Sequence, residues 1–181
     1  GRIGIWNTAF LGDAVLTLPL IRTVKAAFPD SPIDFYVRKG VDSLFTAQPE
    51  LDNVFAYDKR GAQKSLFSAM AYGRELAKKE YSLWISSHTS LRSGIIARWT
   101  SAHTRIGYNK PLINNWLYTT TVDRKFPELE EIERLMQLVK PLNITNILDW
   151  PELVLPQEAY DDAEKFWDEN IDSPVLGVHP G

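Results

Sequence analysis

Short apolar runs rich in β-branched and aromatic residues alternate along this chain with longer amphipathic stretches. The short runs cover residues 2–7, 33–37, 53–57 and 83–87, and the amphipathic stretches cover residues 14–28, 41–47, 65–80 and 90–102. Runs of the first kind are typical of strands, and stretches of the second kind are typical of helices. Strands that alternate with helices build a parallel sheet. We therefore expect an α/β fold, a Rossmann-like open and mostly parallel sheet with helices on both faces.

The second half of the chain has a less regular pattern. We expect one more strand over residues 116–122 and a helix over residues 127–139. A connector bracketed by prolines follows, and it leads into an acidic amphipathic helix over residues 157–170 and a short strand over residues 175–178.

Charge is distributed unevenly along the sequence. Residues 1–125 contain 17 Lys and Arg against 10 Asp and Glu, whereas residues 126–181 contain 3 against 13. A basic sheet domain favours an anionic partner, which is a nucleic acid, a phosphorylated lipid or an acidic sugar.

The residue types that are rare or missing narrow the classes of function. The chain has no cysteine, which excludes disulfides and thiolate ligands, and its three histidines stand at unrelated spacings. No apolar run approaches the roughly 20 residues that span a bilayer, and the sequence starts without the pattern of a signal peptide. We expect a cytoplasmic protein that uses neither a metal nor a cofactor.

The predicted first strand ends at a turn that carries one acid, Asp13. Open α/β sheets bind ligands at the carboxyl ends of their strands, so Asp13 is placed to face a substrate. Aspartate is also a common helix cap, and one residue can fill both roles. The turn over residues 8–13 has one glycine, whereas dinucleotide and P-loop sites need glycine-rich loops. We therefore do not expect a dinucleotide at this turn.

Polar and basic residues follow the predicted strand ends, where they should line one rim of the sheet. Arginine grips phosphate or carboxylate by two-point hydrogen bonds, and lysine adds positive charge. The basic residues of this rim are Arg38, Lys39, Lys59, Arg60, Lys64 and Arg92. For each residue alone a solvated surface role explains the position equally well, but the cluster favours binding. A neighbouring loop that contains Ser87 and His88 is placed to orient sugar hydroxyls.

Four segments agree in order and spacing with a known family. The first, Gly12-Asp13 with Thr17-Leu18-Pro19, resembles the opening of the bacterial ADP-heptose:lipopolysaccharide heptosyltransferases of glycosyltransferase family nine, heptosyltransferase II in particular. The others are Ser90-Leu91-Arg92-Ser93-Gly94 leading to Arg98 and Arg105-Ile106-Gly107-Tyr108, then Glu133-Arg134-Leu135, and finally residues 175–181.

This resemblance implies the N-terminal half of a GT-B fold. Residues 1–143 would be the acceptor-side domain, residues 144–170 a connector with the acidic helix, and residues 171–181 the first strand of a truncated nucleotide-sugar domain. The implied function is transfer of heptose from ADP-heptose to the inner core of lipopolysaccharide. The mechanism would be inverting and independent of metal, and the fragment would be inactive alone.

The resemblance also implies partners and site residues. The partners would be a phosphorylated, anionic glycolipid acceptor and an ADP-sugar donor held mainly by the missing domain, with peripheral contact at the inner face of the inner membrane and no nucleic acid. Asp13 would be the general base. The residues expected to bind substrate are Thr8, Gly12, Arg60, Lys64, Ser87, His88 and Arg92.

Two other interpretations stay open at this point. The acceptor-side motifs do not name the sugar, so the chain also fits a GT-B glycosyltransferase that acts on another glycan. The basic first part also fits a non-enzymatic α/β module that binds a nucleic acid or a protein, because a fold alone does not fix a function.

Overall fold

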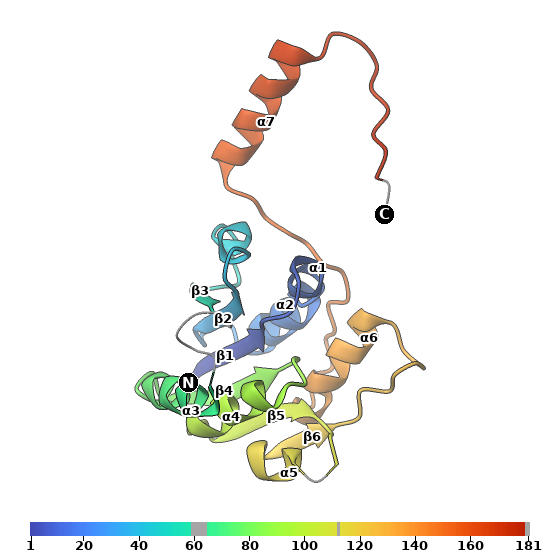
Figure 1. The fold of residues 1–181 in the computed structure, drawn as a ribbon. Coiled ribbons are helices and arrows are strands. Elements are labelled where there is room, and N and C mark those ends of the chain that lie inside the picture. The colour runs from blue at the N-terminus through green and yellow to red at the C-terminus, as the bar shows by residue number, and fades with distance from the viewer. Residues whose placement is uncertain (59–64, 112, 180–181) are drawn as a thin grey trace.

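A six-stranded, all-parallel sheet forms the centre of the molecule (Figure 1). The computed structural model describes residues 1–58, 65–111 and 113–179. In sheet order the strands are β3 (Asn53–Tyr57), β2 (Ile33–Arg38), β1 (Arg2–Asn7), β4 (Tyr81–Ser86), β5 (Thr104–Tyr108) and β6 (Thr120–Val122). The predicted fold class, an open parallel α/β sheet, is therefore confirmed.

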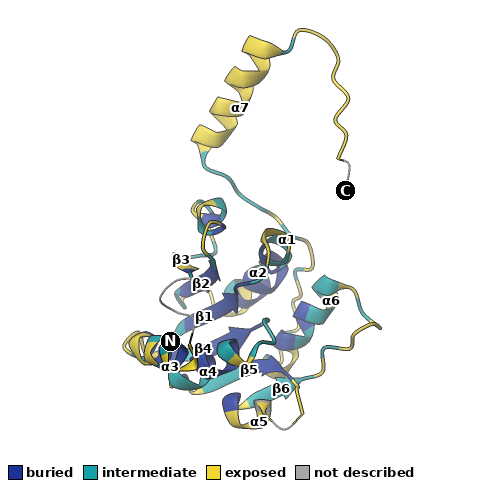
Figure 2. Cartoon of the chain, in the orientation of Figure 1, coloured by how far each residue is buried: buried dark blue, intermediate teal, exposed yellow. Residues whose placement is uncertain are grey.

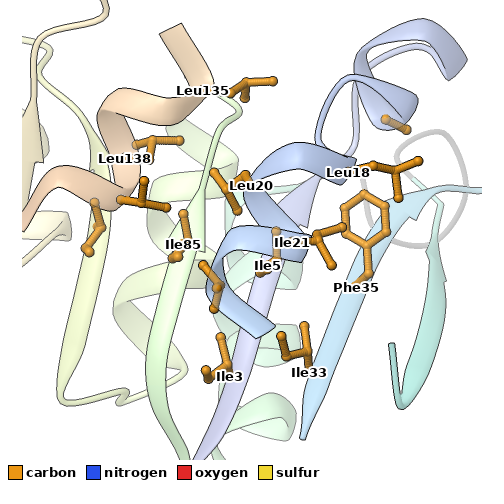
Figure 3. Packing of buried hydrophobic residues seen from close by; sticks show 14 of the residues in the cluster. Ile3, Ile5, Leu18, Leu20, Ile21, Ile33, Phe35, Ile85, Leu135 and Leu138 are labelled. Carbon is orange, nitrogen blue, oxygen red and sulfur yellow. The ribbon is translucent and has the colours of Figure 1, made fainter. Parts of the chain in front are cut away.

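Helix α2 (Leu18–Ala27) covers one face of the sheet, together with α6 (Glu131–Met136) and the 3₁₀ segments η1 (Asp42–Phe45) and η2 (Gln137–Leu142). Figure 3 shows side chains of α2 between those of β1 and β2 and those of α6 and η2. Ile5 and Ile21 are fully buried in this layer. Burial of one such side chain contributes about 2 kcal/mol to folding, so this layer holds the helices firmly against the strands.

The opposite face carries α3 (Leu66–Ala77), α4 (Leu91–Trp99) and the short α5 (Asn114–Leu117). The core on this face is rich in aromatic side chains. Alternate residues of a strand point to opposite faces of a sheet, and Trp6 of β1 points to this one. Trp6 lies 6.0 Å from Trp84 and 5.7 Å from Tyr36, measured between ring centroids. All three rings are completely buried.

The single helix predicted over residues 14–28 is wrong, since the chain forms α1 (Leu11–Val15) and α2 as two separate helices. The break precedes Pro19. Proline has no amide hydrogen, so the bond from residue 19 to the carbonyl of Val15 cannot form. The break places Asp13 in a short helix of its own, beside the end of β1.

The predicted strand over residues 116–122 is only partly correct. Its first residues belong to α5, and the strand itself is limited to β6. The sequence pattern also misses β5, which is flanked on both sides by parallel partners.

The last part of the chain extends away from the sheet. Helix α7 (Gln157–Asn170) follows an extended segment, and every one of its residues is exposed (Figure 2). Residues 171–179 run without regular secondary structure, so the strand predicted over residues 175–178 is not formed in the described chain. Among the described residues, none of the helices combines the length and the apolar character that a membrane crossing requires.

Candidate functional site

A cavity of about 250 Å³ lies at the carboxyl ends of the central strands β1 and β4. This is the edge where open parallel sheets bind their ligands. The residues that line the cavity are Asn7, Ala9, Phe10, Asp13, Ser87, His88, Thr89, Arg124 and Glu131. The structure thus brings together three residues that the sequence placed in the site, Asp13, Ser87 and His88.

Asp13 occupies the third position of α1 and lies partly buried at the cavity wall. Its Oδ2 accepts a hydrogen bond of 3.1 Å from the backbone N–H of Phe10, the residue that caps the helix. Asp13 is thus not the N-cap residue itself, but it stabilises the start of the helix from the third position, as the acid of a capping box does. The hydrogen bond from Phe10 occupies one carboxylate oxygen of Asp13, and the carboxylate still lines the cavity. The helix-stabilising role of Asp13 and proton transfer are therefore compatible.

The buried amide of Asn7 fixes the turn that carries Asp13. Its Nδ2 donates to the carbonyl oxygen of Asp13 at 3.1 Å and to the hydroxyl of Thr17 at 2.7 Å, while its Oδ1 accepts from the backbone N–H of Ala9 at 3.2 Å. The Thr17 hydroxyl donates to the same carbonyl of Asp13 at 2.8 Å. Asn7 is the last residue of β1 and is paired with Val37 of β2, so these hydrogen bonds fix the position of Asp13 relative to the sheet.

His88 is anchored to the aromatic core through hydroxyl groups. Its Nδ1 lies 3.0 Å from the Oγ of Ser90 and 3.1 Å from the Oγ of Ser93. Ser93 Oγ in turn accepts a 2.9 Å hydrogen bond from the indole N–H of the buried Trp6. The imidazole therefore has a fixed orientation at the cavity. Ser87 is held by its own backbone N–H, which donates to the carbonyl of Trp6 at 3.1 Å.

Arg124 and Glu131 complete the cavity and were not predicted from the sequence. Arg124 Nη2 lies 3.3 Å from Glu131 Oε2, and the same carboxylate oxygen accepts from Arg134 Nε at 2.8 Å. The guanidinium of Arg124 also lies 5.6 Å from the ring centroid of Tyr108. Burial raises the pKa of Tyr108, and the charge of Glu131 adds to this rise, so the phenol stays neutral beside the cation.

The remaining predicted site residues are not among those that line this cavity, or they lie outside the described residues. Thr8 is fully buried, and Gly12 is exposed in α1. Arg92 lies in the first turn of α4 beside Tyr57, whose pKa is raised by burial and lowered in part by the Arg92 charge. Arg60 and Lys64 lie outside the described residues.

Of the other rim cations, Lys59 lies outside the described residues, and both Arg38 and Lys39 have partners. Arg38 places its guanidinium 5.3 Å from the ring centroid of Phe10, which lines the cavity, so it contributes positive charge at the edge of the site. Lys39 forms an exposed ion pair of 3.4 Å with Asp58.

The cavity has four ionisable groups in its wall: the carboxylates of Asp13 and Glu131, the imidazole of His88, and the guanidinium of Arg124, which is paired with Glu131. A carboxylate can remove a proton from a hydroxyl held within hydrogen-bond reach, and a guanidinium can hold an anionic group of the same ligand. Within the described ranges, no three His, Cys, Asp or Glu side chains are grouped so that they could hold a metal ion.

Comparison with known proteins points to one class of enzyme. No family model matches the chain. The lipopolysaccharide heptosyltransferase 3 of Escherichia coli (strain K12) is 23% identical over 139 residues, which cover 75% of this chain and 40% of that protein. The lipopolysaccharide heptosyltransferase 1 of Pseudomonas aeruginosa is 24% identical over 187 aligned positions, which cover 97% of this chain and 50% of that protein.

Solved structures agree with this sequence similarity. A glycosyltransferase family 9 protein from Veillonella parvula has a TM-score of 0.82 at 20% identity, and the match covers 99% of this chain and 55% of that one. The E. coli heptosyltransferase WaaC, solved with ADP, has a TM-score of 0.66 at 21% identity over 80% of this chain and 48% of that one. The chain therefore has the fold of the glycosyltransferase family 9 structures. Its sequence is similar to those of lipopolysaccharide heptosyltransferases over most of its residues, and it spans about half of their length.

Proposed function

We propose that this chain is the acceptor-side part of a glycosyltransferase that moves heptose from ADP-heptose to the inner core of lipopolysaccharide. One observation carries the proposal: Asp13 lies in a cavity at the carboxyl edge of the sheet, in a chain similar to a lipopolysaccharide heptosyltransferase over 97% of its residues. The proposed setting is the cytoplasmic face of the inner membrane, where such an acceptor presents its sugars.

The proposed reaction uses Asp13 as the general base. The carboxylate accepts the proton of an acceptor hydroxyl while the hydroxyl oxygen attacks the anomeric carbon of the donor sugar. The bond between that carbon and the diphosphate oxygen breaks, and ADP leaves with the electron pair. Attack from the side opposite the leaving group inverts the anomeric configuration, and no metal is assigned to the step.

The acceptor is proposed to be a phosphorylated, acidic glycolipid. Arg124 lines the cavity itself, and Arg38 lies beside Phe10 at its edge, so both can hold anionic groups of such a ligand. His88 and Ser87 are placed to hydrogen-bond sugar hydroxyls. Arg92, Arg60 and Lys64 are proposed to extend the same cationic rim.

The donor is proposed to bind mainly outside this chain. Residues 1–143 form the acceptor side, residues 144–170 contain the connector and α7, and residues 171–181 are proposed to begin a nucleotide-sugar domain. Catalysis at a cleft needs both of its walls, so the 181-residue chain should release no ADP from an ADP-sugar by itself.

The substitution Asp13→Asn in the full-length protein tests the proposal. Asparagine keeps an oxygen that can accept the hydrogen bond from Phe10, but it cannot take a proton. We expect turnover, measured as ADP release, to fall by about two to four powers of ten at an unchanged melting temperature. Normal turnover would remove Asp13 as the base.

The matched control is Asp42→Asn. Asp42 also accepts a backbone hydrogen bond at a turn, from Gly40 N–H at 3.1 Å, but it does not line the cavity. Turnover of this variant should stay within about twofold of wild type. An equal loss in both variants would show that the effect comes from the turns and not from proton transfer.

A further inference from the structure

A second cavity, of about 400 Å³, lies at the far end of α4. The residues that line it are Arg74, Ala77, Arg98, Trp99, Ser101 and Trp116. The candidate site is next to the start of α4, where Ser90 caps the helix, whereas Arg98 and Trp99 end it. A helix of nine residues is about 13 Å long, so the two cavities lie at opposite edges of the sheet.

Two tryptophans form a rigid corner of this cavity, which we call the Arg–Trp cavity. The centroids of Trp99 and Trp116 are 5.7 Å apart, and the ring planes meet at 71°. The guanidinium of Arg98 lies 6.0 Å from the first centroid and 5.9 Å from the second. These contacts hold the cation in place, while Trp116 remains 62% exposed to solvent.

Close packing of α3 against α4 brings a second arginine to the same place. Gly73 allows this approach, because a Cβ atom at position 73 would lie 2.6 Å from the Cβ of Trp99 and 2.9 Å from the carbonyl oxygen of Ile96. Arg74 follows immediately and lines the cavity. The two guanidinium groups therefore come from different helices that are fixed to one another.

The positive charge of the Arg–Trp cavity is not balanced by a carboxylate among the described residues. Among the described residues, no carboxylate forms an ion pair with Arg74 or Arg98, and none lines the cavity. Arg105, on the adjoining strand β5, bonds to the carbonyl oxygens of Leu117 and Ala102. Burial lowers the pKa of Arg105, and the charge of Arg98 lowers it further. An anion would relieve this repulsion.

An adjoining cavity of about 450 Å³ has a different character. It shares Ala77 and Ser101 with the Arg–Trp cavity, and it also has Glu80 and His103 in its wall. The Glu80 carboxylate repels a phosphate but accepts hydrogen bonds from hydroxyl groups. A ligand that spans both cavities would therefore place an anionic group at the arginines and a hydroxyl-rich group toward Glu80.

We infer that the Arg–Trp cavity and its neighbour form a second binding site, at the edge of the sheet opposite the candidate site, for a phosphorylated saccharide. Arg74 and Arg98 hold the phosphate group by charge-assisted hydrogen bonds. The indole of Trp116 forms an apolar wall beside the sugar, and Ser101, Glu80 and His103 bind its hydroxyls. This site is independent of the proposed transfer reaction, since none of its residues lines the candidate site.

Nuclear magnetic resonance of the 181-residue chain tests this site through the indole N–H signals. The signals of residues 99 and 116 are assigned with Trp99→Phe and Trp116→Phe. We expect glucose 6-phosphate to shift both signals, inorganic phosphate to do so only at concentrations about tenfold higher, and glucose to leave them unchanged. Arg98→Gln should weaken the binding of glucose 6-phosphate by about tenfold or more, the effect of one lost charge-assisted hydrogen bond.

Lys78→Gln is the matched control, because it also removes one positive charge, at the C-cap of α3, but Lys78 pairs with Glu75 and does not line the cavity. It should change the affinity by less than twofold. If Arg98→Gln fails to fold, the exposed Arg74→Gln gives the same test. Equal shifts with glucose, equal affinities for phosphate and glucose 6-phosphate, binding unchanged in both arginine variants, or shifts with anionic lipid vesicles alone would each overturn the inference.

Discussion

Asp34 is the most completely satisfied buried charge in the described part of the sheet. Its carboxylate is fully buried at the start of β2, where Arg2 donates at 2.8 Å, Asn53 donates at 2.9 Å and the Tyr81 hydroxyl donates at 2.5 Å. Tyr36 extends the network through a 2.6 Å contact with Tyr81. A buried carboxylate is tolerated only with partners of this number and quality.

Removal of this carboxylate should destabilise the protein strongly. Asp34→Ala leaves Arg2, Asn53 and Tyr81 without their acceptor, and we expect the free energy of unfolding to fall by about 3 kcal/mol. Urea unfolding measures the change. The exposed Asp30→Ala is the control and should have an effect below about 0.5 kcal/mol; comparable losses in the two variants would contradict the argument.

Arg124 is the cation that the structure adds to the proposed acceptor site. If it holds an anionic group of the acceptor, Arg124→Gln in the full-length protein should raise the acceptor KM by about tenfold with a smaller effect on kcat. Steady-state kinetics measures both constants. Lys140→Gln, which removes an exposed charge at η2, should change neither; an unchanged KM in Arg124→Gln would exclude this role.

The chain order of the site residues explains which of them could be predicted. Ser87 and His88 directly follow β4, and Asp13 lies in α1, the short helix that follows β1. The apolar runs of both strands are evident in the sequence. Arg124 follows β6, a strand of three residues, and Glu131 begins the next helix. Their approach to the cavity depends on where an edge strand ends, which no periodic pattern in the sequence specifies.

The contact between α3 and α4 has no room for a side chain at Gly73. Alanine favours helix over glycine by about 1 kcal/mol, but a Cβ atom would meet the Trp99 Cβ and the Ile96 carbonyl oxygen. We expect the steric cost to exceed the gain, so that Gly73→Ala lowers the free energy of unfolding by about 1 to 3 kcal/mol.

Gly12→Ala provides the matched control for this substitution. Gly12 is also helical, and a Cβ atom there would have nothing within 4 Å. Thermal unfolding should show an unchanged or higher melting temperature for Gly12→Ala and a lower one for Gly73→Ala. A stabilised Gly73→Ala would mean that α3 and α4 adjust their separation freely.

Most helices and strands could be predicted, because the spacing of apolar residues in their sequences corresponds to the faces that are buried in the fold. The central strands β1, β2 and β4 are almost entirely buried, and their apolar runs identify them in the sequence. The sequence-based predictions fail where tertiary contacts determine the secondary structure. Strand β5 has only five residues, which include Arg105 and Gly107, and it forms between β4 and β6. Leu117 is helical, and its side chain packs beside Gly94 of α4.

Separate parts of the molecule carry opposite net charges. The sheet and its helices hold the basic first part of the sequence, whereas the acidic α7 is joined to them by an extended segment and lies apart in Figure 1. The ion pair recorded within α7 joins its own Lys165 and Glu169 at 3.9 Å. None of the ion pairs among the described residues joins α7 to Arg124, Arg74 or Arg98, so the acidic helix does not neutralise the arginines that line the two cavities.

Buried phenols distinguish the folded molecule from the unfolded chain at high pH. Burial raises the pKa of Tyr72 to about 12 and also raises the pKa of Tyr118 to about 12, against a hydrogen bond with Ser86 that lowers it. The unfolded chain releases these protons near pH 10. The folded state therefore binds more protons than the unfolded state between pH 10 and 12, and stability must fall as the pH rises through this range.

We accordingly expect the free energy of unfolding to be insensitive to these two phenols below about pH 9 and to decline above pH 10. Tyr118→Phe removes one of them, so its urea-unfolding curve should lose up to about 2 kcal/mol less than wild type between pH 9 and pH 11.5. Tyr160→Phe alters an exposed residue of α7 and should follow the wild-type decline. Parallel declines in wild type and Tyr118→Phe would show that the phenol of Tyr118 titrates alike in both states, and that its burial does not hold the proton.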